Sequence, residues 1–131
     1  MKHWCCALLM LSCTNLAVAA WERAGAMDDG TVIYADPASV KKTDDIVNMW
    51  SLLDYKTPEK DGAGKPYSSV KLMQEFDCKT AQGRTRFFSV HTGPMGTGAL
   101  VHSEMRANSE WRPANGAKTG ELLWQAACGK K

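Results

Sequence analysis

Five cysteines are distributed very unevenly along this chain of 131 residues. Cys5, Cys6 and Cys13 lie near the amino terminus, whereas Cys78 and Cys128 lie far along the chain. If the amino-terminal segment is removed, a single pairing remains, and its two members are 50 residues apart. A covalent link of that span would hold two distant parts of the fold together. The fate of the amino terminus therefore decides how strongly the fold is constrained.

The amino terminus has the three parts of a secretory signal peptide. Lys2 gives a basic start, residues 4–13 form an apolar stretch, and residues 17–20 are small. A helix over the apolar stretch would rise only about 15 Å, half of the roughly 30 Å hydrocarbon core, which disfavours a membrane anchor. The pattern predicts export, with cleavage after Ala19 or after Ala20.

A second kind of processing remains open. Leu9-Met10-Leu11-Ser12-Cys13 is similar to a loose bacterial lipobox, in which the cysteine carries a lipid anchor. Soluble export would remove Cys13, whereas lipidation would keep it and hold the protein on a membrane. The two products differ in mass and in detergent partitioning.

Only Cys78 and Cys128 remain in a signal-cleaved product, and an exported chain meets an oxidising compartment. We therefore expect a Cys78–Cys128 disulfide, with two buried free thiols as the alternative. In the chain-entropy model a loop of this length contributes about 4 kcal/mol to stability. The pair lacks the Cys-x-x-Cys spacing that is typical of redox and metal motifs.

Removal of residues 1–20 leaves residues 21–131, which have the length of one domain with one hydrophobic core. The formal net charge is +2, from 16 basic and 14 acidic residues. Nucleic-acid-binding proteins carry a basic patch, and Lys41-Lys42 or the pair Arg84 and Arg86 are too small to form one. We therefore expect no nucleic-acid partner.

Clusters of turn residues divide residues 21–131 into short segments, as in an antiparallel β-sheet. Apolar and polar residues alternate along Tyr67–Cys78, so that Cys78 falls on the core face. Residues 56–66 are polar and rich in Gly and Pro, which predicts a mobile loop. Further strands are expected at Thr31–Asp36, Ile46–Tyr55, Arg84–Thr92 and Ala99–Arg106.

Two local features complete the predicted fold. Ile46–Tyr55 is apolar on both faces, which predicts a central strand or one covered by a helix. Asp36 is placed to cap a single helical turn at Pro37–Val40.

Strong helix formers fill Glu121–Cys128, with Thr119 or Gly120 as the start and Gly129 as the end of the helix. One face of this helix would carry the second cysteine. The predicted fold class is α+β, an antiparallel β-sheet with a C-terminal α-helix packed on it and tethered by a disulfide.

His91 and His102 are the only histidines after the signal peptide. If the hairpin between them closes around a tip at Met95–Gly98, the two imidazoles face each other across the strands, with Glu104 on the same face. Such a pair could hold a metal ion or a haem iron. The alternative is two ordinary strand histidines, because metal sites usually have three or four ligands.

The sequence contains no Ser/His/Asp order, no Gly-x-Ser-x-Gly and no His-Glu-x-x-His motif. The carboxylates Asp28, Asp29, Asp44 and Asp45 lie in turn-like sequence, where capping and solvent exposure account for them. We therefore expect no catalytic residues and no cofactor.

Several segments together carry a family resemblance: Val32–Val40, Val47–Trp50, Tyr67-Ser68-Ser69 leading to Glu75-Phe76-Asp77-Cys78, and Cys128. Over Trp21–Cys128 the chain resembles the surface-adhesin protein E-like domain of proteobacteria. The resemblance implies an antiparallel sheet with a C-terminal helix tethered by a Cys78–Cys128 disulfide. It also implies binding of host extracellular-matrix components, but the family's binding segments have no residue-by-residue counterpart here.

The leading hypothesis is a non-enzymatic, adhesin-like exported module in the periplasm or cell envelope, or on the outer surface, of a Gram-negative bacterium. Its partner would be a protein from the host matrix or the envelope, with membrane contact only if Cys13 is lipidated. The alternative is a haem- or metal-binding periplasmic carrier that uses His91 and His102, and a small hydrolase comes third.

Overall fold

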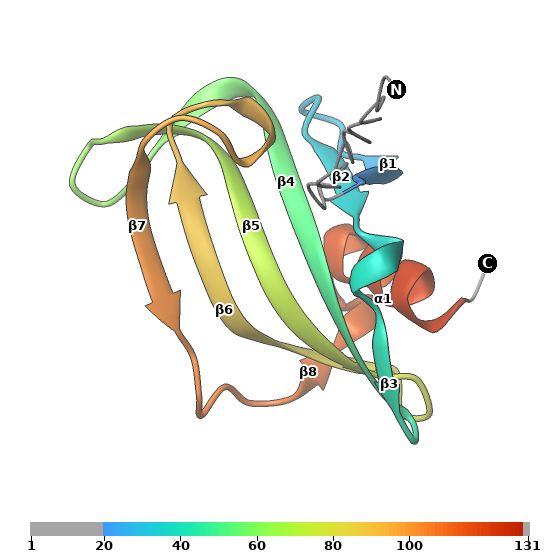
Figure 1. Ribbon diagram of the computed structural model, residues 1–131. Helices are drawn as coiled ribbons and strands as arrows, with labels where there is room; N and C mark the ends of the chain where they lie inside the picture. Colours follow the sequence, from blue (N-terminus) through green and yellow to red (C-terminus); the bar gives the residue numbers. More distant parts are fainter. Residues whose placement is uncertain (1–19, 130–131) are drawn as a thin grey trace, which may run out of the picture.

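The computed structural model describes residues 20–129 as a curved antiparallel β-sheet with one α-helix packed on one of its faces (Figure 1). The strands are β1 (Glu22–Ala26), β2 (Val32–Ala35), β3 (Lys41–Thr43), β4 (Ile46–Lys60), β5 (Pro66–Asp77), β6 (Gln82–His91), β7 (Leu100–Met105) and β8 (Arg112–Pro113). The helix is α1 (Lys118–Cys128), and single 3-10 turns form η1 (Pro37–Ser39), η2 (Pro94–Gly96) and η3 (Ala114–Gly116).

Residues 1–19 lie outside the described part of the chain, and with them Cys13 and almost all of the predicted signal peptide. Among residues 20–129, no helix has the length and apolar character needed to cross a membrane.

Strands that follow one another along the chain are mostly neighbours in the sheet. The order is β1-β2-β4-β5-β6-β7, and every neighbouring pair is antiparallel. The short strands β3 and β8 pair with parts of β4 and β6. In Figure 1, β7 forms the edge of the sheet that lies away from α1. The predicted antiparallel sheet is confirmed.

The central position of β4 explains why its sequence is apolar on both faces. On one face, Val47 and Met49 are 2% and 1% exposed and pack in the core cluster that includes α1. On the other face, Leu52 is fully buried, and the rings of Trp50 and Phe87 meet edge to face with centroids 5.8 Å apart. Both parts of the prediction are confirmed, since β4 is central and a helix covers one of its faces.

Helix α1 begins at Lys118, one residue before the first predicted start, and ends at Cys128. Gly129 follows in the left-handed conformation, with φ of 66°, which glycine adopts without steric penalty. The helix buries Leu123 and Ala127 against the sheet residues Ile33, Ala35, Val47, Met49 and Phe76. This cluster is the core of the fold.

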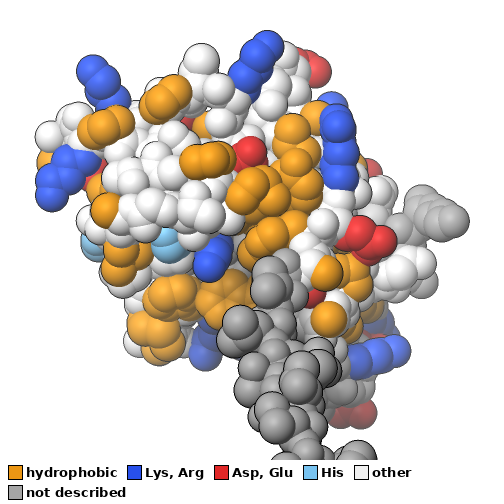
Figure 2. Space-filling model, turned by 45° about the horizontal axis from the view of Figure 1, so that its top comes forward, with side chains coloured by type: hydrophobic (Ala, Val, Ile, Leu, Met, Phe, Trp, Pro, Cys, Tyr) orange, Lys and Arg blue, Asp and Glu red, His pale blue; other side chains and the backbone are white. Residues whose placement is uncertain are grey.

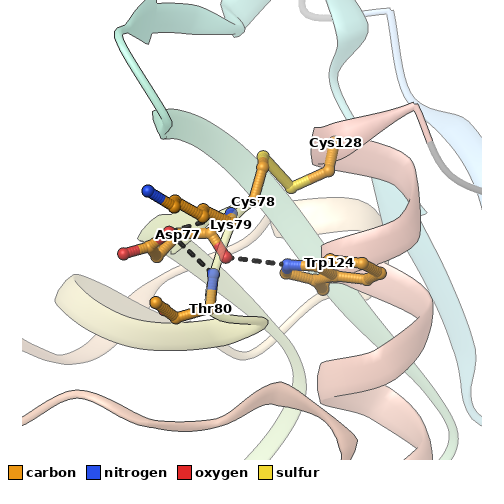
Figure 3. The surroundings of a disulfide bond; sticks show 6 residues. All are labelled: Asp77, Cys78, Lys79, Thr80, Trp124 and Cys128. Carbon is orange, nitrogen blue, oxygen red and sulfur yellow. Dashed lines mark hydrogen bonds between the residues drawn. A yellow bond between two sulfur atoms is a disulfide. The ribbon is translucent and has the colours of Figure 1, made fainter.

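The predicted disulfide joins the helix to the end of β5 (Figure 3). Cys78 and Cys128 lie with their Cα atoms 5.6 Å apart. The carboxylate of Asp77 accepts hydrogen bonds from the backbone N–H groups of Lys79 and Thr80, at 2.9 and 3.1 Å. These hydrogen bonds lower the pKa of Asp77, and the bond from Thr80 has the largest effect. The α+β fold class with a tethered C-terminal helix is thus confirmed.

The turn η1 attaches to β4 through two hydrogen bonds, one of which runs from the N–H of Asp36 to the carbonyl of Trp50 at 3.0 Å. Asp36 caps η1 as predicted, because its carboxylate accepts from the N–H of Ala38 at 3.2 Å. The hydroxyl of Ser39 accepts from the N–H of Trp50 at 2.9 Å. The segment after β2 is thereby fixed against the sheet.

The prediction of a mobile loop at residues 56–66 is wrong. Strands β4 and β5 extend until only residues 61–65 separate them. Pairing stops after Asp54 and resumes at Glu59, with a bulge between. Pro58, which has no N–H to donate, falls in that irregular stretch, where a sheet tolerates proline. The glycines and prolines of the segment mark a bulge and a short turn rather than a long loop.

Candidate functional site

The face of the sheet that carries α1 extends well beyond the helix. Helix α1 has 11 residues, about 16 Å of length, whereas β5 has 12 residues, about 40 Å. Cross-strand partners share a face, and the register sets Val70 and Leu72 of β5 beside Val90 and Phe88 of β6. These four side chains lie on the helix-bearing face but outside the core cluster beneath α1.

A row of hydrogen bonds separates this apolar end from the core. The hydroxyl of Ser51 donates to Oε1 of Gln74 at 3.1 Å, and Nε2 of Gln74 donates to Oγ1 of Thr85 at 3.4 Å. Ser51 is fully buried, so its hydroxyl requires such a partner. The row marks where the core ends and the uncovered apolar surface begins.

The four apolar side chains line a pocket with a volume of about 490 Å³. Tyr67 and His102 line it as well, and Asp61 and Gly62 reach it from the turn between β4 and β5. Asp61 holds that turn in place by accepting two backbone hydrogen bonds within it. The volume lies within the range of ligand-binding sites, which are mostly apolar with a few polar groups. We call this site the apolar pocket.

Aromatic and charged side chains lie together beside the apolar pocket. The rings of Phe88 and His102 have centroids 5.8 Å apart, and Nε2 of His102 lies 3.6 Å from Oε2 of Glu104. The guanidinium of Arg106 lies over the Phe88 ring, 5.5 Å from its centroid. Burial raises the pKa of Tyr67, so its hydroxyl stays neutral and can donate a hydrogen bond. The pocket therefore offers an apolar floor with a polar surround.

The opposite face of the sheet has a different cover, which is the connection between β6 and β7. The hydroxyl of Ser69, which is fully buried, donates to the carbonyl of Gly93 at 2.7 Å and accepts from the N–H of Gly96 at 2.8 Å. The carboxylate of Asp54 accepts from the N–H of Met95 at 2.8 Å. These bonds hold η2 against β4 and β5.

The structure separates the two histidines that the sequence analysis paired. His91 lies opposite Leu100 and Val90 lies opposite His102, with one extra β7 residue between the two pairs. Adjacent strand residues point to opposite faces, so His102 lines the apolar pocket while His91 lies on the other face, 2.8 Å from the hydroxyl of Ser89. The predicted juxtaposition is wrong because this bulge shifts the register by one residue.

Without that juxtaposition, the alternative of a haem or metal carrier loses the geometry on which it rested. Within residues 20–129, no three His, Cys, Asp or Glu side chains gather in a way that could hold a metal ion.

The acidic residues of the predicted turns have local roles. The carboxylate of Asp29 accepts from the N–H of Thr31 at 2.9 Å, and this hydrogen bond lowers the pKa of Asp29. Asp44 lies in the turn between β3 and β4 with a positive φ of 54°, a conformation that aspartate tolerates better than most residues. Turn formation accounts for both residues, as the sequence indicated.

The alternation predicted along Tyr67–Cys78 gives this strand an inner face, but the sequence did not single out Phe88, Tyr67 or Asp61 as residues of a pocket. The available signal was an excess of apolar residues along the two strands over what one short helix can cover. That signal indicates an uncovered surface, but it does not show which residues from the β4–β5 turn would lie next to it.

Comparison with known proteins supports the same fold. The family model described as "Surface-adhesin protein E" matches residues 21–129. The selenomethionine form of Haemophilus influenzae protein E is 12% identical, with 86% of this chain and 88% of that chain covered and a TM-score of 0.62. Protein E from non-typeable Haemophilus influenzae is 13% identical, with 86% and 77% covered and a TM-score of 0.61. No curated protein sequence matches this chain significantly. Because the family model spans most of the sequence, the chain belongs to the surface-adhesin protein E family.

Proposed function

We propose that this chain is an exported, non-enzymatic, adhesin-like protein that binds a partner protein through the apolar pocket. Membership of the surface-adhesin protein E family supports binding rather than catalysis. The partner would be a protein of the host matrix or of the bacterial envelope. The observation that carries the proposal is an apolar floor that α1 leaves uncovered.

The chemistry of the apolar pocket suits an aromatic or aliphatic side chain of the partner. Its floor is made by Val70, Leu72, Phe88 and Val90, and burial of apolar surface contributes about 25 cal/mol per Å². Apolar anchors surrounded by polar groups are typical of protein interfaces. On the molecular surface, hydrophobic side chains lie in several exposed groups with Lys and Arg side chains around them (Figure 2).

The experiment compares two neighbouring phenylalanines on opposite faces. The full chain is expressed in a Gram-negative host, purified as the cell processes it, and tested for binding to purified extracellular-matrix proteins fixed on a surface. Phe88→Ala should weaken binding because it removes part of the pocket floor. Phe87→Ala is the control, since Phe87 packs against Trp50 on the other face.

A loss of binding counts for the proposal only if it comes from the change in the pocket and not from a loss of folding stability. Both variants delete a half-buried phenyl ring, so their unfolding midpoints are measured alongside binding. If Phe88→Ala and Phe87→Ala bind as well as the unsubstituted protein, or lose binding equally, the apolar pocket is not the binding site. A hydrophobic dye such as anilinonaphthalene sulfonate gives a second readout, and only Phe88→Ala should reduce its fluorescence.

For export, we propose that residues 1–20 act as a signal peptide and that residues 21–131 are the mature domain. The disulfide supports this proposal, because such bonds persist in oxidising compartments. Intact mass of the purified protein would give a first residue of Trp21 or Ala20. A product that begins at Cys13, carries lipid mass and partitions into detergent would contradict the soluble form.

A further inference from the structure

A second cavity lies beside the apolar pocket, where the connection from β7 leads back along β6 to β8 (Figure 1). Its volume is about 470 Å³. Gln74 and Thr85, the hydrogen-bonded pair that ends the core on the helix-bearing face, form its strand side. The connection and β8 contribute polar and charged residues, among them Arg106, Ser109 and Arg112. We call this cavity the arginine pocket.

Backbone and side-chain hydrogen bonds fix the wall of the arginine pocket to β6. The N–H of Arg106 donates to the carbonyl of Arg86 at 2.8 Å, and Nη1 of Arg86 donates to the carbonyl of Ala107 at 2.7 Å. At the other end of the connection, Arg112 of β8 pairs with Gly83 of β6. The lining is therefore held in place before a ligand arrives, which lowers the entropy cost of binding.

Arg112 supplies the charge that a ligand can use. Of the other arginines that line the pocket, Arg84 already has an ion pair, with Nη2 at 3.3 Å from Glu75. Nε of Arg106 lies 3.8 Å from Oε1 of Glu104, and both side chains are about half exposed. Among residues 20–129, Arg112 has no ion-pair partner. Its guanidinium is therefore available to a carboxylate from outside, which arginine binds through two parallel hydrogen bonds.

Two buried polar atoms of the lining also lack a hydrogen-bond partner in the described part of the chain. They are Nε of Arg84 and Oγ of Ser109. Buried polar groups almost always have such a partner, so these two atoms favour a polar ligand in the cavity. Both can donate a hydrogen bond, and an ionised carboxylate only accepts.

The arginine pocket and the apolar pocket are adjacent. Gln74 lines the former and Leu72 lines the latter, and these two residues are two positions, about 7 Å, apart on one face of β5. Arg106 joins the two cavities, because it lines the arginine pocket while its guanidinium lies over the ring of Phe88 in the apolar pocket. An extended peptide has the same spacing between side chains on one of its faces.

Building on the proposed function, we propose that the arginine pocket takes an acidic side chain of the partner protein. The partner's apolar side chain enters the apolar pocket, and its Asp or Glu, two residues away in an extended segment, pairs with Arg112. Arg106 and Ser109 add hydrogen-bond donors at the same end. The partner is thereby narrowed to a protein that exposes an extended segment of the type Phe-x-Glu or Glu-x-Phe.

The test uses short peptides and the full chain, purified as the cell processes it and isotope-labelled for NMR. The probes are acetyl-Gly-Phe-Ser-Glu-Gly-amide and acetyl-Gly-Glu-Ser-Phe-Gly-amide, which cover both directions of the segment. In the matched control peptides, Gln replaces Glu. The amide shifts of Thr85, Phe88 and Ser109 give the dissociation constant. At least one probe should shift amides at both pockets and bind about tenfold more tightly than its Gln control.

Substitutions of Arg112, which is exposed, test the pairing in the protein. Arg112→Gln should remove the preference for Glu over Gln. Arg112→Lys should keep part of it, because lysine retains the charge but not the two parallel hydrogen bonds. Arg23→Gln is the control for net charge and should keep the whole preference, since Arg23 is an exposed residue of β1 at the opposite edge of the sheet.

The results distinguish the role of the arginine pocket from that of the apolar pocket. If the Glu and Gln peptides bind equally while both shift the amide of Phe88, the apolar pocket binds the peptide but the arginine pocket does not take the acidic residue. A preference for Glu that persists in Arg112→Gln overturns the pairing in the same way. If neither probe shifts the amide of Phe88, the proposed use of the apolar pocket fails as well.

Discussion

The indole Nε1 of Trp124 donates a hydrogen bond of 3.1 Å to the carbonyl oxygen of Asp77, the residue immediately before Cys78 (Figure 3). Cys128 lies four residues after Trp124, one helical turn along the same face of α1. The helix is therefore attached to the end of β5 twice, once by a hydrogen bond and once by the disulfide. The two attachments can be removed separately.

We predict that Trp124→Phe lowers the free energy of unfolding by about 1 kcal/mol, because the ring packs similarly but the Asp77 carbonyl loses its donor. Urea unfolding followed by circular dichroism measures the change. Trp111→Phe is the control. The Trp111 ring lies against the Arg84 guanidinium, 4.3 Å from the ring centroid, and a phenyl ring can keep that contact, so this variant should lose less stability than Trp124→Phe. An unchanged midpoint for Trp124→Phe would show that the hydrogen bond contributes nothing.

We predict that the double variant Cys78→Ala and Cys128→Ala loses about 4 kcal/mol of stability, because the unfolded chain regains the entropy of a 50-residue loop. The same unfolding assay measures it. Adding a reductant should destabilise the unsubstituted protein by a similar amount and leave the double variant unchanged. A reductant effect on the double variant would mean that the assay reports something other than this bond.

The sequence predicted this part of the fold well because its signals are local. Alternation along β5 sets Cys78 on the core face, and the glycine after Cys128 ends the helix in a left-handed conformation. Once the amino-terminal segment is taken as removed, one pairing of cysteines remains. By contrast, residues 56–66 contain the same glycines and prolines that mark loops, and only the pairing with β5 shows that Pro58 lies in a bulge.

We predict that Ser69→Ala destabilises the protein by about 2 kcal/mol, because two backbone groups of the β6–β7 connection lose a buried partner. Ser68→Ala is a matched control, since Ser68 is the adjacent residue and points to the other face. Unfolding in urea compares the two, and amide exchange at Gly96 should rise only in Ser69→Ala. Equal losses in both variants would assign the effect to β5 rather than to the connection.

We predict that stability falls as the pH drops below about 6.5, in part through His91. Burial, assisted by the nearby Lys71 charge, holds the pKa of His91 below its ordinary value. The unfolded chain therefore takes up this proton at a higher pH than the folded protein does, so acidification favours unfolding and stability returns above the unfolded pKa.

Unfolding midpoints measured between pH 5 and pH 8 give the size of this dependence. His91→Gln should reduce the slope, because it removes the histidine whose pKa the fold lowers. If the slope in His91→Gln equals the slope in the unsubstituted protein, His91 is not a source of the pH dependence.

The candidate site could be predicted only in part. The sequence shows that His91 and His102 belong to the two arms of one hairpin, but one extra residue in β7 sends their side chains to opposite faces. A bulge of one residue depends on tertiary packing and leaves no clear pattern in the sequence. The apolar pocket depends likewise on where α1 stops along the sheet, which is a property of the packed fold.

The strand order also has a consequence for how the chain folds. Apart from the short β3 and β8, each strand pairs with its neighbour along the chain, so most of the sheet can assemble from local hairpins. The entropy cost of closing a loop grows with the length of chain between the paired residues, so pairings between consecutive strands form more readily than pairings between distant segments. The helix, in contrast, must return to strands that precede it by many residues. We therefore expect the sheet to form first and to present Cys78 at its end before Cys128 arrives, so that oxidation completes folding rather than directing it.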